Sequence, residues 1–366
     1  MTLRRMKSFF DPARMDSPQV PSPTPAFGRD PRITAASSHC GYGRCGRMAN
    51  LAVALTLLLA APGFVQHVAA AGLAVTESAS RPTEWTLAYE GKTVMVYAFD
   101  PQKFKPYVKA LSSPDGHEVL RDSPFDHLHH HALMYGIRVN GVNFWEETAG
   151  CGVQKVVECP PPVAEPGRGG LQQARVTQLL YWLAPEDAFL PNTNAQPLLI
   201  ERRTLVLTID PARHETALHW HSAFEVGSKT NQVTLGGANY HGLGMRFLKE
   251  LDPVAVHLAP EGPLDLANNR QEVTPHPWEA VLFDLPGKTA TIALFGAESN
   301  ARGNAHYFAM KTPFAYLSAT QHLDQEPLVY RHGEHFELSY LITLCSGLKT
   351  AESLTERSRQ WRSSGQ

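Results

Sequence analysis

Histidines are concentrated in one short segment of this chain. The run from Asp126 to His131 contains His127, His129, His130 and His131, out of 17 histidines in 366 residues. If this run is extended, His127, His129 and His131 share one face and His130 points to the other. Imidazoles that converge in this way can bind a metal ion or transfer protons near neutral pH.

The same cluster suggests acid/base chemistry. We expect His129 and His130 to act as general acid or base, with Asp126 orienting an imidazole through a hydrogen bond. Asp122 stands four residues earlier and suits the same orienting role. The alternative is that these histidines are solvent-facing polar residues on an open β-face.

A second His-x-His pattern occurs at His219 and His221. In a strand, both point to one side while Leu218 and Trp220 point to the other. If the two patterns are neighbours in the fold, His127 and His129 can hold a divalent metal such as zinc together with His219 and His221. A metal-free acid/base site is the alternative.

Candidate substrate-binding residues follow in a glycine-rich segment, 236–246. Asn239 and His241 are polar groups among glycines, which allow close backbone approach. Arg246 stands between Met245 and Phe247, where a buried charge is costly unless it pairs with a carboxylate or faces a polar pocket. The glycines do not form a nucleotide fingerprint, because no Gly-x-Gly-x-x-Gly follows a strand and opens a helix.

Trp145 and Glu146 are further candidates, as an aromatic platform with an adjacent carboxylate. The alternative is a core tryptophan beside solvated acids. Asn300 begins another polar run and joins the list of binding candidates.

The elements that must position these residues are short strands. β-branched and aromatic residues dominate apolar runs that are separated by Gly, Pro, Asn and Asp. This pattern predicts an all-β protein, a large antiparallel two-sheet β-sandwich, as one domain over residues 80–360, with a short helix near 354–361. The clearest predicted strands are 85–89, 94–99, 132–139, 176–183, 198–209, 214–226, 280–285, 289–295, 314–319 and 336–345.

Composition and charge exclude several functions. The chain is 43% hydrophobic and 19% charged, with a formal charge of −2, so nothing indicates a basic surface for nucleic acid. No apolar run is long enough for a multi-span membrane protein. Residues 72–366 alone hold 25 basic and 32 acidic residues, a balance that also disfavours an anionic membrane surface.

The N-terminal region differs from the rest. Residues 1–47 are rich in Pro, Ser and Arg without periodicity, which predicts a disordered extension. Residues 48–71 combine an apolar run with an Ala-Ala-Ala-Gly sequence, the layout of a signal peptide that is cleaved before Gly72. We therefore expect an exported protein, periplasmic or extracellular, without a stable membrane span after processing; a short membrane anchor is the alternative.

Three cysteines follow the predicted cleavage site. Cys151 and Cys159 flank a short segment and can form a disulfide in an oxidising compartment, or remain two free thiols. Cys345 lies in an apolar strand, where a small buried side chain is expected.

Segments 122–136 (DSPFDHLHHHALMYG) and 139–145 (VNGVNFW) resemble the PmoA-related family of bacterial proteins of unknown function, as do the runs at 242–247, 298–300 and 333–334. Leu128 stands where the family often has Pro, and His131-Ala132 where it often has Arg-Gly, so His131 is the weaker site candidate. The resemblance implies an exported β-sandwich similar to galactose mutarotase-like supersandwiches, which commonly bind sugars on an open concave face. It carries no indication of methane oxidation.

Two functions remain. The first is an exported carbohydrate-active enzyme, of lyase, hydrolase or epimerase type, that uses the histidine-rich site on a carbohydrate or modified sugar. The second is a non-catalytic glycan-binding accessory protein.

Overall fold

The computed structural model describes residues 66–70, 72–77, 83–188 and 194–364. The predicted N-terminal extension, residues 1–47, and residues 48–65 of the predicted signal peptide lie outside the described residues. Residues 66–70 form an edge strand, so the predicted cleavage site falls between this strand and the next one, which begins at Leu73.

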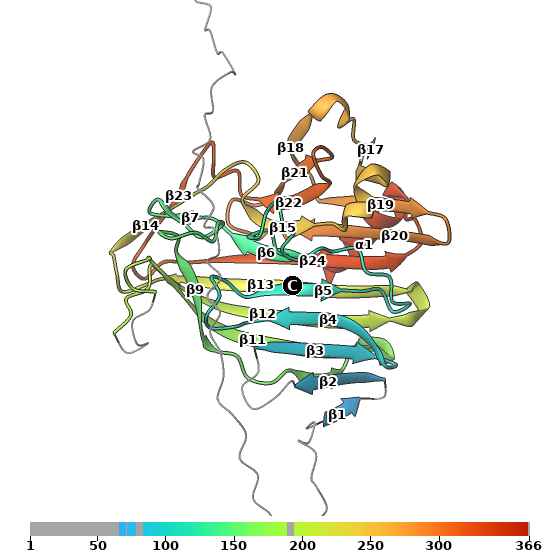
Figure 1. Cartoon of the computed structure of the whole chain (residues 1–366), viewed down its shortest axis with the longest axis horizontal. Coiled ribbons are helices and arrows are strands. Elements are labelled where there is room, and N and C mark those ends of the chain that lie inside the picture. The colour runs from blue at the N-terminus through green and yellow to red at the C-terminus, as the bar shows by residue number, and fades with distance from the viewer. Residues whose placement is uncertain (1–65, 71, 78–82, 189–193, 365–366) are drawn as a thin grey trace, which may run out of the picture. The chain divides into compact units, whose positions relative to one another are not determined.

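The first sheet contains ten antiparallel strands, and its first five follow one another along the chain (Figure 1). Its central strands come from distant parts of the sequence, which is why no local pattern reveals its order. In spatial order the strands are β1 (Gln66–Ala70), β2 (Leu73–Glu77), β3 (Glu84–Tyr89), β4 (Lys92–Ala98), β5 (Tyr107–Leu111), β6 (Leu133–Gly136), β15 (Gly242–Arg246), β22 (Tyr316–Thr320), β21 (His306–Met310) and β18 (Gln271–Pro275).

The second sheet also contains ten strands, and its centre is built from the longest strands of the chain. In spatial order they are β10 (Val163–Pro166), β11 (Gln172–Leu183), β12 (Leu199–Asp210), β13 (Glu215–Val226), β24 (His335–Ser346), β20 (Lys288–Gly296), β19 (Trp278–Leu285), β16 (Ala255–Ala259) and β17 (Gly262–Pro263), with β9 (Val153–Glu158) pairing with β11.

Smaller elements complete the structure. A four-stranded sheet has the order β23 (Leu328–Arg331), β14 (Gln232–Gly236), β7 (Arg138–Val139) and β8 (Val142–Asn143). The helix α1 (Ala351–Ser363) begins at a capping box formed by Thr350 and Ser353 and confirms the predicted C-terminal helix. Short 3-10 turns occupy 168–170, 211–213, 249–254 and 267–269. No helix among the described residues is long and apolar enough to cross a membrane.

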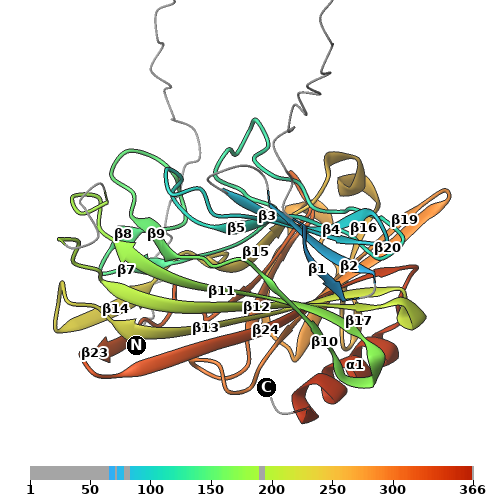
Figure 2. The same ribbon diagram turned by 90° about the horizontal axis from the view of Figure 1, so that it is seen from below.

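The two large sheets pack face to face, as Figure 2 shows with β3 and β4 in one layer and β11 and β12 in the other. Trp85 and Leu87 of β3 belong to the same buried cluster as Leu218 and Trp220 of β13. Because strand side chains alternate between faces, alternate residues of strands such as β3 and β13 point into this core. The prediction of an all-β, antiparallel two-sheet sandwich is confirmed.

One polar network crosses the core. The Arg203 guanidinium donates to both carboxylate oxygens of Glu201, at 2.7 and 3.0 Å, and to the Gln154 side chain at 3.1 Å. It also donates to the Tyr97 hydroxyl of the first sheet at 3.3 Å. Arg203 and Glu201 side chains are fully buried, so each charge depends on the other.

The first sheet has a second apolar cluster on its outer face. Met134 of β6, Phe308 and Met310 of β21, and Tyr316 of β22 gather there with Trp145. The residues that alternate with them, such as Leu133 and Leu317, join the core between the sheets. The candidate site lies on this outer face.

The three cysteines in the described part of the chain are free thiols. The Sγ of Cys159 accepts a hydrogen bond from the Trp85 indole at 3.3 Å, whereas Cys151 contacts the Thr148 hydroxyl. The alternative without a disulfide is therefore the one observed.

Candidate functional site

The histidine loop, residues 121–131, runs from Leu120, which pairs with Phe247 in an isolated β-bridge, to β6. It is not extended: the His127 amide donates to the Pro124 carbonyl and the His130 amide to the His127 carbonyl, both at 2.9 Å, so two turns follow each other. The prediction that His127, His129 and His131 share one face is therefore wrong, because turns replace the alternation of side chains that an extended run would have. The cause is local turn chemistry, with Pro124 and Asp126 in positions that favour turns.

These turns bring three imidazoles together. The His127 and His130 rings stack at 4.6 Å between centroids, and the His129 ring meets His130 edge-on at 4.6 Å. The ring of Phe314 lies edge-on to both His127 and His130, at 5.2 and 5.8 Å. The loop therefore presents His127, His129 and His130 as one cluster, while His131 is directed elsewhere.

The cluster forms one wall of a cavity of about 390 Å³, a size within the range of about 300–1,000 Å³ that is typical of small-molecule sites. The loop after β14 supplies Asn239 and Tyr240, and the loop after β8 supplies Glu146. Strands β18, β21 and β22 supply apolar and amide groups. The lining residues are His127, His129, His130, Glu146, Asn239, Tyr240, Gln271, Phe308, Met310, Phe314 and Tyr316.

The two innermost imidazoles are neutral. Burial, together with the neighbouring His129 and His127, Arg246 and Lys105, lowers the pKa of His130 to about 3. Burial also lowers the pKa of His129, with further lowering by the charges of Lys105 and His127 and an opposing effect of Glu146 and Glu147. Neutral imidazoles can accept a proton or donate a hydrogen bond, which is what proton transfer requires.

His131 anchors the loop instead of lining the cavity. Its Nδ1 lies 2.7 Å from Asp122 Oδ1 and its Nε2 lies 2.8 Å from Glu147 Oε1, while the Tyr107 ring stacks on the imidazole at 3.6 Å. Each ring nitrogen thus faces a carboxylate oxygen, and these two contacts fix the orientation of the imidazole.

Lys105 completes this series of hydrogen-bonded polar side chains. Its Nζ donates to the Trp145 carbonyl and to Glu147 Oε1, each at 2.8 Å, and the residue is 2% exposed. Burial opposes ionisation of Glu147, but the hydrogen bond from His131 and the charge of Lys105 lower its pKa to about 2. In the series Asp122, His131, Glu147 and Lys105, carboxylates therefore alternate with nitrogen-bearing side chains.

Two of the cavity residues, His130 and Glu146, each have an anchored residue as their neighbour in sequence. His130 lines the cavity and His131 is anchored; Glu146 lines the cavity and Glu147 is anchored. Because His131 and Glu147 bond to each other, the positions of His130 and Glu146 are fixed relative to each other.

Asp126 orients a different imidazole from those expected. Its Oδ2 lies 3.2 Å from His127 Nδ1 and 3.6 Å from Arg246 Nη2. The expectation that Asp126 orients His129 or His130 is therefore wrong, since the turns place His127 beside it. Arg246 does not line the cavity. Its guanidinium packs 3.3 Å from the ring centroid of Phe314, and Phe314 is part of the cavity wall.

Trp145 and His241 lie behind the cavity. Trp145 is fully buried and stacks on the His241 ring at 5.0 Å, so it is a core tryptophan and not an open aromatic platform. Burial lowers the pKa of His241 to about 3. Gly244 permits this packing, because a Cβ there would lie only 2.9 Å from the Trp145 indole and would overlap the Tyr316 hydroxyl.

Of the remaining binding candidates, Asn239 and Glu146 line the cavity and Asn300 does not. The Asn300 side chain exchanges hydrogen bonds with the backbone of Ser339 in β24, at 3.1 and 2.6 Å. It is a buried residue of the turn after β20 that holds this turn to β24, so its predicted binding role is wrong.

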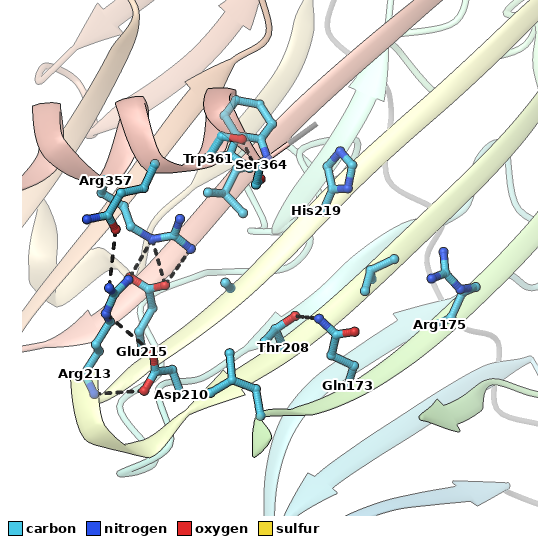
Figure 3. Close-up of a pocket in the computed structure, with 15 residues that line it drawn as sticks. Gln173, Arg175, Thr208, Asp210, Arg213, Glu215, His219, Arg357, Trp361 and Ser364 are labelled. Atoms are coloured by element: carbon cyan, nitrogen blue, oxygen red, sulfur yellow. Dashed lines mark hydrogen bonds and ion pairs between the residues drawn. The ribbon is translucent and has the colours of Figure 1, made fainter. Parts of the chain in front are cut away.

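The structure does not bring the two His-x-His pairs together. His219 and His221 lie on β13 of the second sheet and face away from the core, as the pattern predicted, but His127 and His129 belong to the first sheet's outer face. Figure 3 shows His219 near Trp361 of α1, in a different cavity. The proposed four-histidine metal set is therefore not assembled, and no group of three or more metal-ligating side chains occurs among the described residues.

Sequence reasoning missed the aromatic and amide part of the wall. Tyr240 lies between two candidates, Asn239 and His241. Phe314 and Tyr316 lie in the predicted strand 314–319, whose apolar pattern gave no signal of which face is open. Lys105 carried one usable signal, because a lysine between Phe104 and Pro106 in an apolar context needs a partner.

Comparisons with known proteins place the chain in a family but not in a function. Similar solved structures include the family 36 α-galactosidase AgaB from Geobacillus stearothermophilus, at 10% identity and a TM-score of 0.42, over 75% of this chain and 41% of that one. The galactosidase domain of the α-galactosidase-sucrose kinase AgaSK matches at 11% identity and a TM-score of 0.37, over 75% of this chain and 42% of that one. The chain thus spans about two fifths of the galactosidase chains.

A galactose mutarotase related enzyme from Lactobacillus acidophilus also matches, at 8% identity and a TM-score of 0.31, over 70% of this chain and 96% of that one. No curated protein matches the chain. The model of a family of unknown function, DUF6807, matches residues 84–359. The chain therefore belongs to this family of unknown function.

Proposed function

We propose that this protein is an exported carbohydrate-active enzyme that moves protons on a sugar held in the cavity, as an epimerase or a lyase does. The observation that carries the proposal is the pair of neutral imidazoles, His129 and His130, in one cavity wall that also contains Glu146. His129, the less buried of the two, is the proton-transfer residue; His130 donates or accepts a hydrogen bond to the reacting group.

The rest of the wall suits a sugar ring. Phe308, Phe314 and Tyr316 offer flat apolar surface for the C–H face of a pyranose. Asn239 and Gln271 add amide groups that both donate and accept hydrogen bonds, as ring hydroxyls require. A cavity with one aromatic side and several convergent polar groups is typical of small polar ligands.

Hydrolysis by paired carboxylates is less well supported than proton transfer. Most glycosidases use two carboxyl groups that flank the scissile bond. Among the described residues that line the cavity, Glu146 is the single carboxylate, and Asp126 is engaged with His127. Of the lyase, hydrolase and epimerase types, we therefore favour the lyase and the epimerase.

The test is a panel of neutral sugars and uronic acids, incubated with the full chain and followed by NMR. We expect one panel member to be converted by the wild type and by His335→Gln, a control at an exposed histidine of β24. His129→Gln should lower the turnover at least about a hundredfold, the typical contribution of general acid/base catalysis, without lowering the melting temperature.

A non-catalytic glycan-binding protein is the alternative outcome. Saturable binding of a sugar without any product over long incubation would support it and exclude the enzyme. Conversion that proceeds equally in His129→Gln would instead assign the reaction to other residues.

Export and the relation to PmoA-like proteins remain part of the proposal. A signal peptide over residues 48–71 would yield a chain that begins at Gly72 and therefore lacks β1. The motifs of segments 122–136 and 139–145 support the PmoA relation.

A further inference from the structure

A further cavity, of about 420 Å³, is lined by parts of both large sheets. Strand β16 of the second sheet supplies residues 255–257, and the segment after β21 of the first sheet supplies Lys311 and Thr312. The loop between β17 and β18 supplies residues 264–269 (Figure 1). None of the described residues lines both this cavity, which we call the β16 cavity, and the cavity of the histidine loop.

The buried polar side chain of the β16 cavity is His257. This residue is 2% exposed, and neither of its ring nitrogens makes a well-formed hydrogen bond with a described residue. Its backbone carbonyl accepts a hydrogen bond from the Leu264 amide at 2.9 Å, which holds β16 to the loop that covers the cavity. A buried polar group without a partner is costly, so an unpartnered imidazole in a cavity wall points to a ligand.

The imidazole of His257 is neutral. Burial and the charge of Lys311 lower the pKa of His257 to about 4, against a smaller opposing effect of the Met310 backbone. A neutral imidazole carries one ring N–H, so His257 can donate one hydrogen bond to a ligand without bringing a charge of its own.

Lys311 gives the β16 cavity a positive charge. Its side chain is half-buried, and no described residue forms an ion pair with its ammonium group. Asp265 is the single carboxylate among the described lining residues, but it is 75% exposed and lies 3.8 Å from the Arg270 guanidinium. A half-buried charge without a counter-charge favours an anion as its partner.

We propose that the β16 cavity binds an oxyanion, held by the Lys311 ammonium and the His257 imidazole. The ammonium has three donors and no acceptor, and the side-chain amides of Asn268 and Asn269 add further donors to the wall. Phosphate, sulfate and carboxylate groups share the acceptor oxygens that these donors require. This site lies apart from the proposed sugar site, and the inference does not depend on the proposed function.

A metal cation and a neutral sugar fit the β16 cavity less well. The Lys311 ammonium repels a cation, and no group of three or more metal-ligating side chains occurs in the described part of the chain. A neutral sugar can accept hydrogen bonds but leaves the charge of Lys311 without a partner.

The experiment titrates the full chain with sodium phosphate, sodium sulfate and sodium acetate by isothermal titration calorimetry, with sodium chloride at matched ionic strength as the reference. The variants are Lys311→Gln and His257→Phe, which keeps a flat ring and removes both ring nitrogens. Lys103→Gln is the matched control, because Lys103 is an exposed lysine between β4 and β5 and its substitution removes the same charge.

We expect at least one of the three anions to bind saturably at one site, and the anion that binds most tightly identifies the class of ligand. Lys311→Gln and His257→Phe should each weaken this binding at least about tenfold, about 1.4 kcal/mol. Lys103→Gln should bind as the wild type does.

A second measurement covers the case in which His257→Phe does not fold. Crystals of the wild type are soaked in the anion that binds most tightly, and the difference density locates it. We expect its oxygens within hydrogen-bond distance of the His257 ring and of Lys311 Nζ.

Four results would overturn the inference. The first is the absence of saturable binding for all three anions, and the second is equal affinity in Lys311→Gln and the wild type. The third is full affinity in a folded His257→Phe, and the fourth is an anion that lies away from His257 in the crystal. Either of the last two would reduce the site to an adventitious ion on a surface lysine.

Discussion

At the scale of single residues, depth of burial separates the roles of neighbouring histidines. Burial lowers the pKa of His130 to about 3, so this imidazole is neutral near neutral pH. His129 is less buried and its pKa is lowered from the ordinary value near 6.5. Of these two histidines, His129 is thus the one suited to exchange a proton during turnover.

The pH profile follows from this difference. A general base acts only when it is deprotonated, so activity falls as the pH falls through its pKa. Because that pKa lies below the ordinary value, we predict that the acid limb of kcat/KM lies below pH 6.5. A profile with its acid limb above that pH would contradict the role of His129 as a base.

Residue types in the cluster were predictable from the sequence, but their partners were not. The density of histidines pointed to residues 127–131, and three of them line the cavity. His131, the weakest candidate, makes hydrogen bonds of 2.7 and 2.8 Å to Asp122 and Glu147. The sequence did not reveal the bond to Glu147, because the two residues are sixteen positions apart and no spacing rule links them. Trp145 and Asn300 had suitable chemistry for binding and are buried in structural roles instead.

At the scale of elements, the histidine loop depends on the partly buried carboxylate of Glu147. Glu147→Gln keeps the shape of the side chain but removes the counter-charge of Lys105 and the carboxylate that His131 contacts. Breaking a buried ion pair from one side costs about 3–5 kcal/mol, and we predict a loss near the lower end because the amide oxygen still accepts a hydrogen bond. Chemical denaturation measures this loss.

The effect should depend on pH in a defined direction. The pKa of Glu147 is depressed to about 2, so its stabilisation is present above the ordinary value of 4.5 and is lost as the pH falls toward 2. The difference between wild type and Glu147→Gln should therefore shrink over that range. Glu337→Gln, at an exposed pair with His221, is the control, and it should cost less than about 1 kcal/mol. Equal losses for the two variants would contradict the anchoring role.

Long strands were predictable, whereas short strands and loops were not. The predicted strands 198–209 and 214–226 coincide closely with β12 and β13, because apolar alternation over a dozen residues is a strong local signal. Strands such as β14, β17 and β23 have two to five residues, and they exist only because a partner strand offers hydrogen bonds. The predicted strand 132–139 is split between β6 and β7, which belong to different sheets.

At the scale of the whole molecule, Arg203 joins the two sheets through a buried network. Arg203→Met removes the partner of the fully buried Glu201 and the hydrogen bond to Tyr97. We predict a loss of about 3–5 kcal/mol in the free energy of unfolding. Arg202→Met is the control, because Arg202 is 66% exposed and lies 3.9 Å from Glu225; it should change stability by less than about 1 kcal/mol. A small effect of Arg203→Met would show that the network is dispensable.

The fold class followed from the sequence, but the order of strands did not. Alternation and turn residues predict strands, and enough strands predict a sandwich. The neighbours of β6 are β5 and β15, and more than a hundred residues separate β6 from β15 in sequence. Such long-range pairings place His219 and His221 on the second sheet, whereas the histidine loop leads into β6 of the first sheet, so the proposed metal set is not assembled.

The most direct test of the account is solvent deuterium incorporation during turnover. The protein is incubated in D2O with the sugar that the panel identifies, and NMR follows the exchange of a carbon-bound hydrogen or its elimination. The account predicts exchange or elimination by the wild type and by His335→Gln. The rate of this exchange or elimination should be at least about a hundredfold lower in His129→Gln. Conversion without exchange or elimination at any carbon, or equal rates in His129→Gln, would contradict proton transfer by this site.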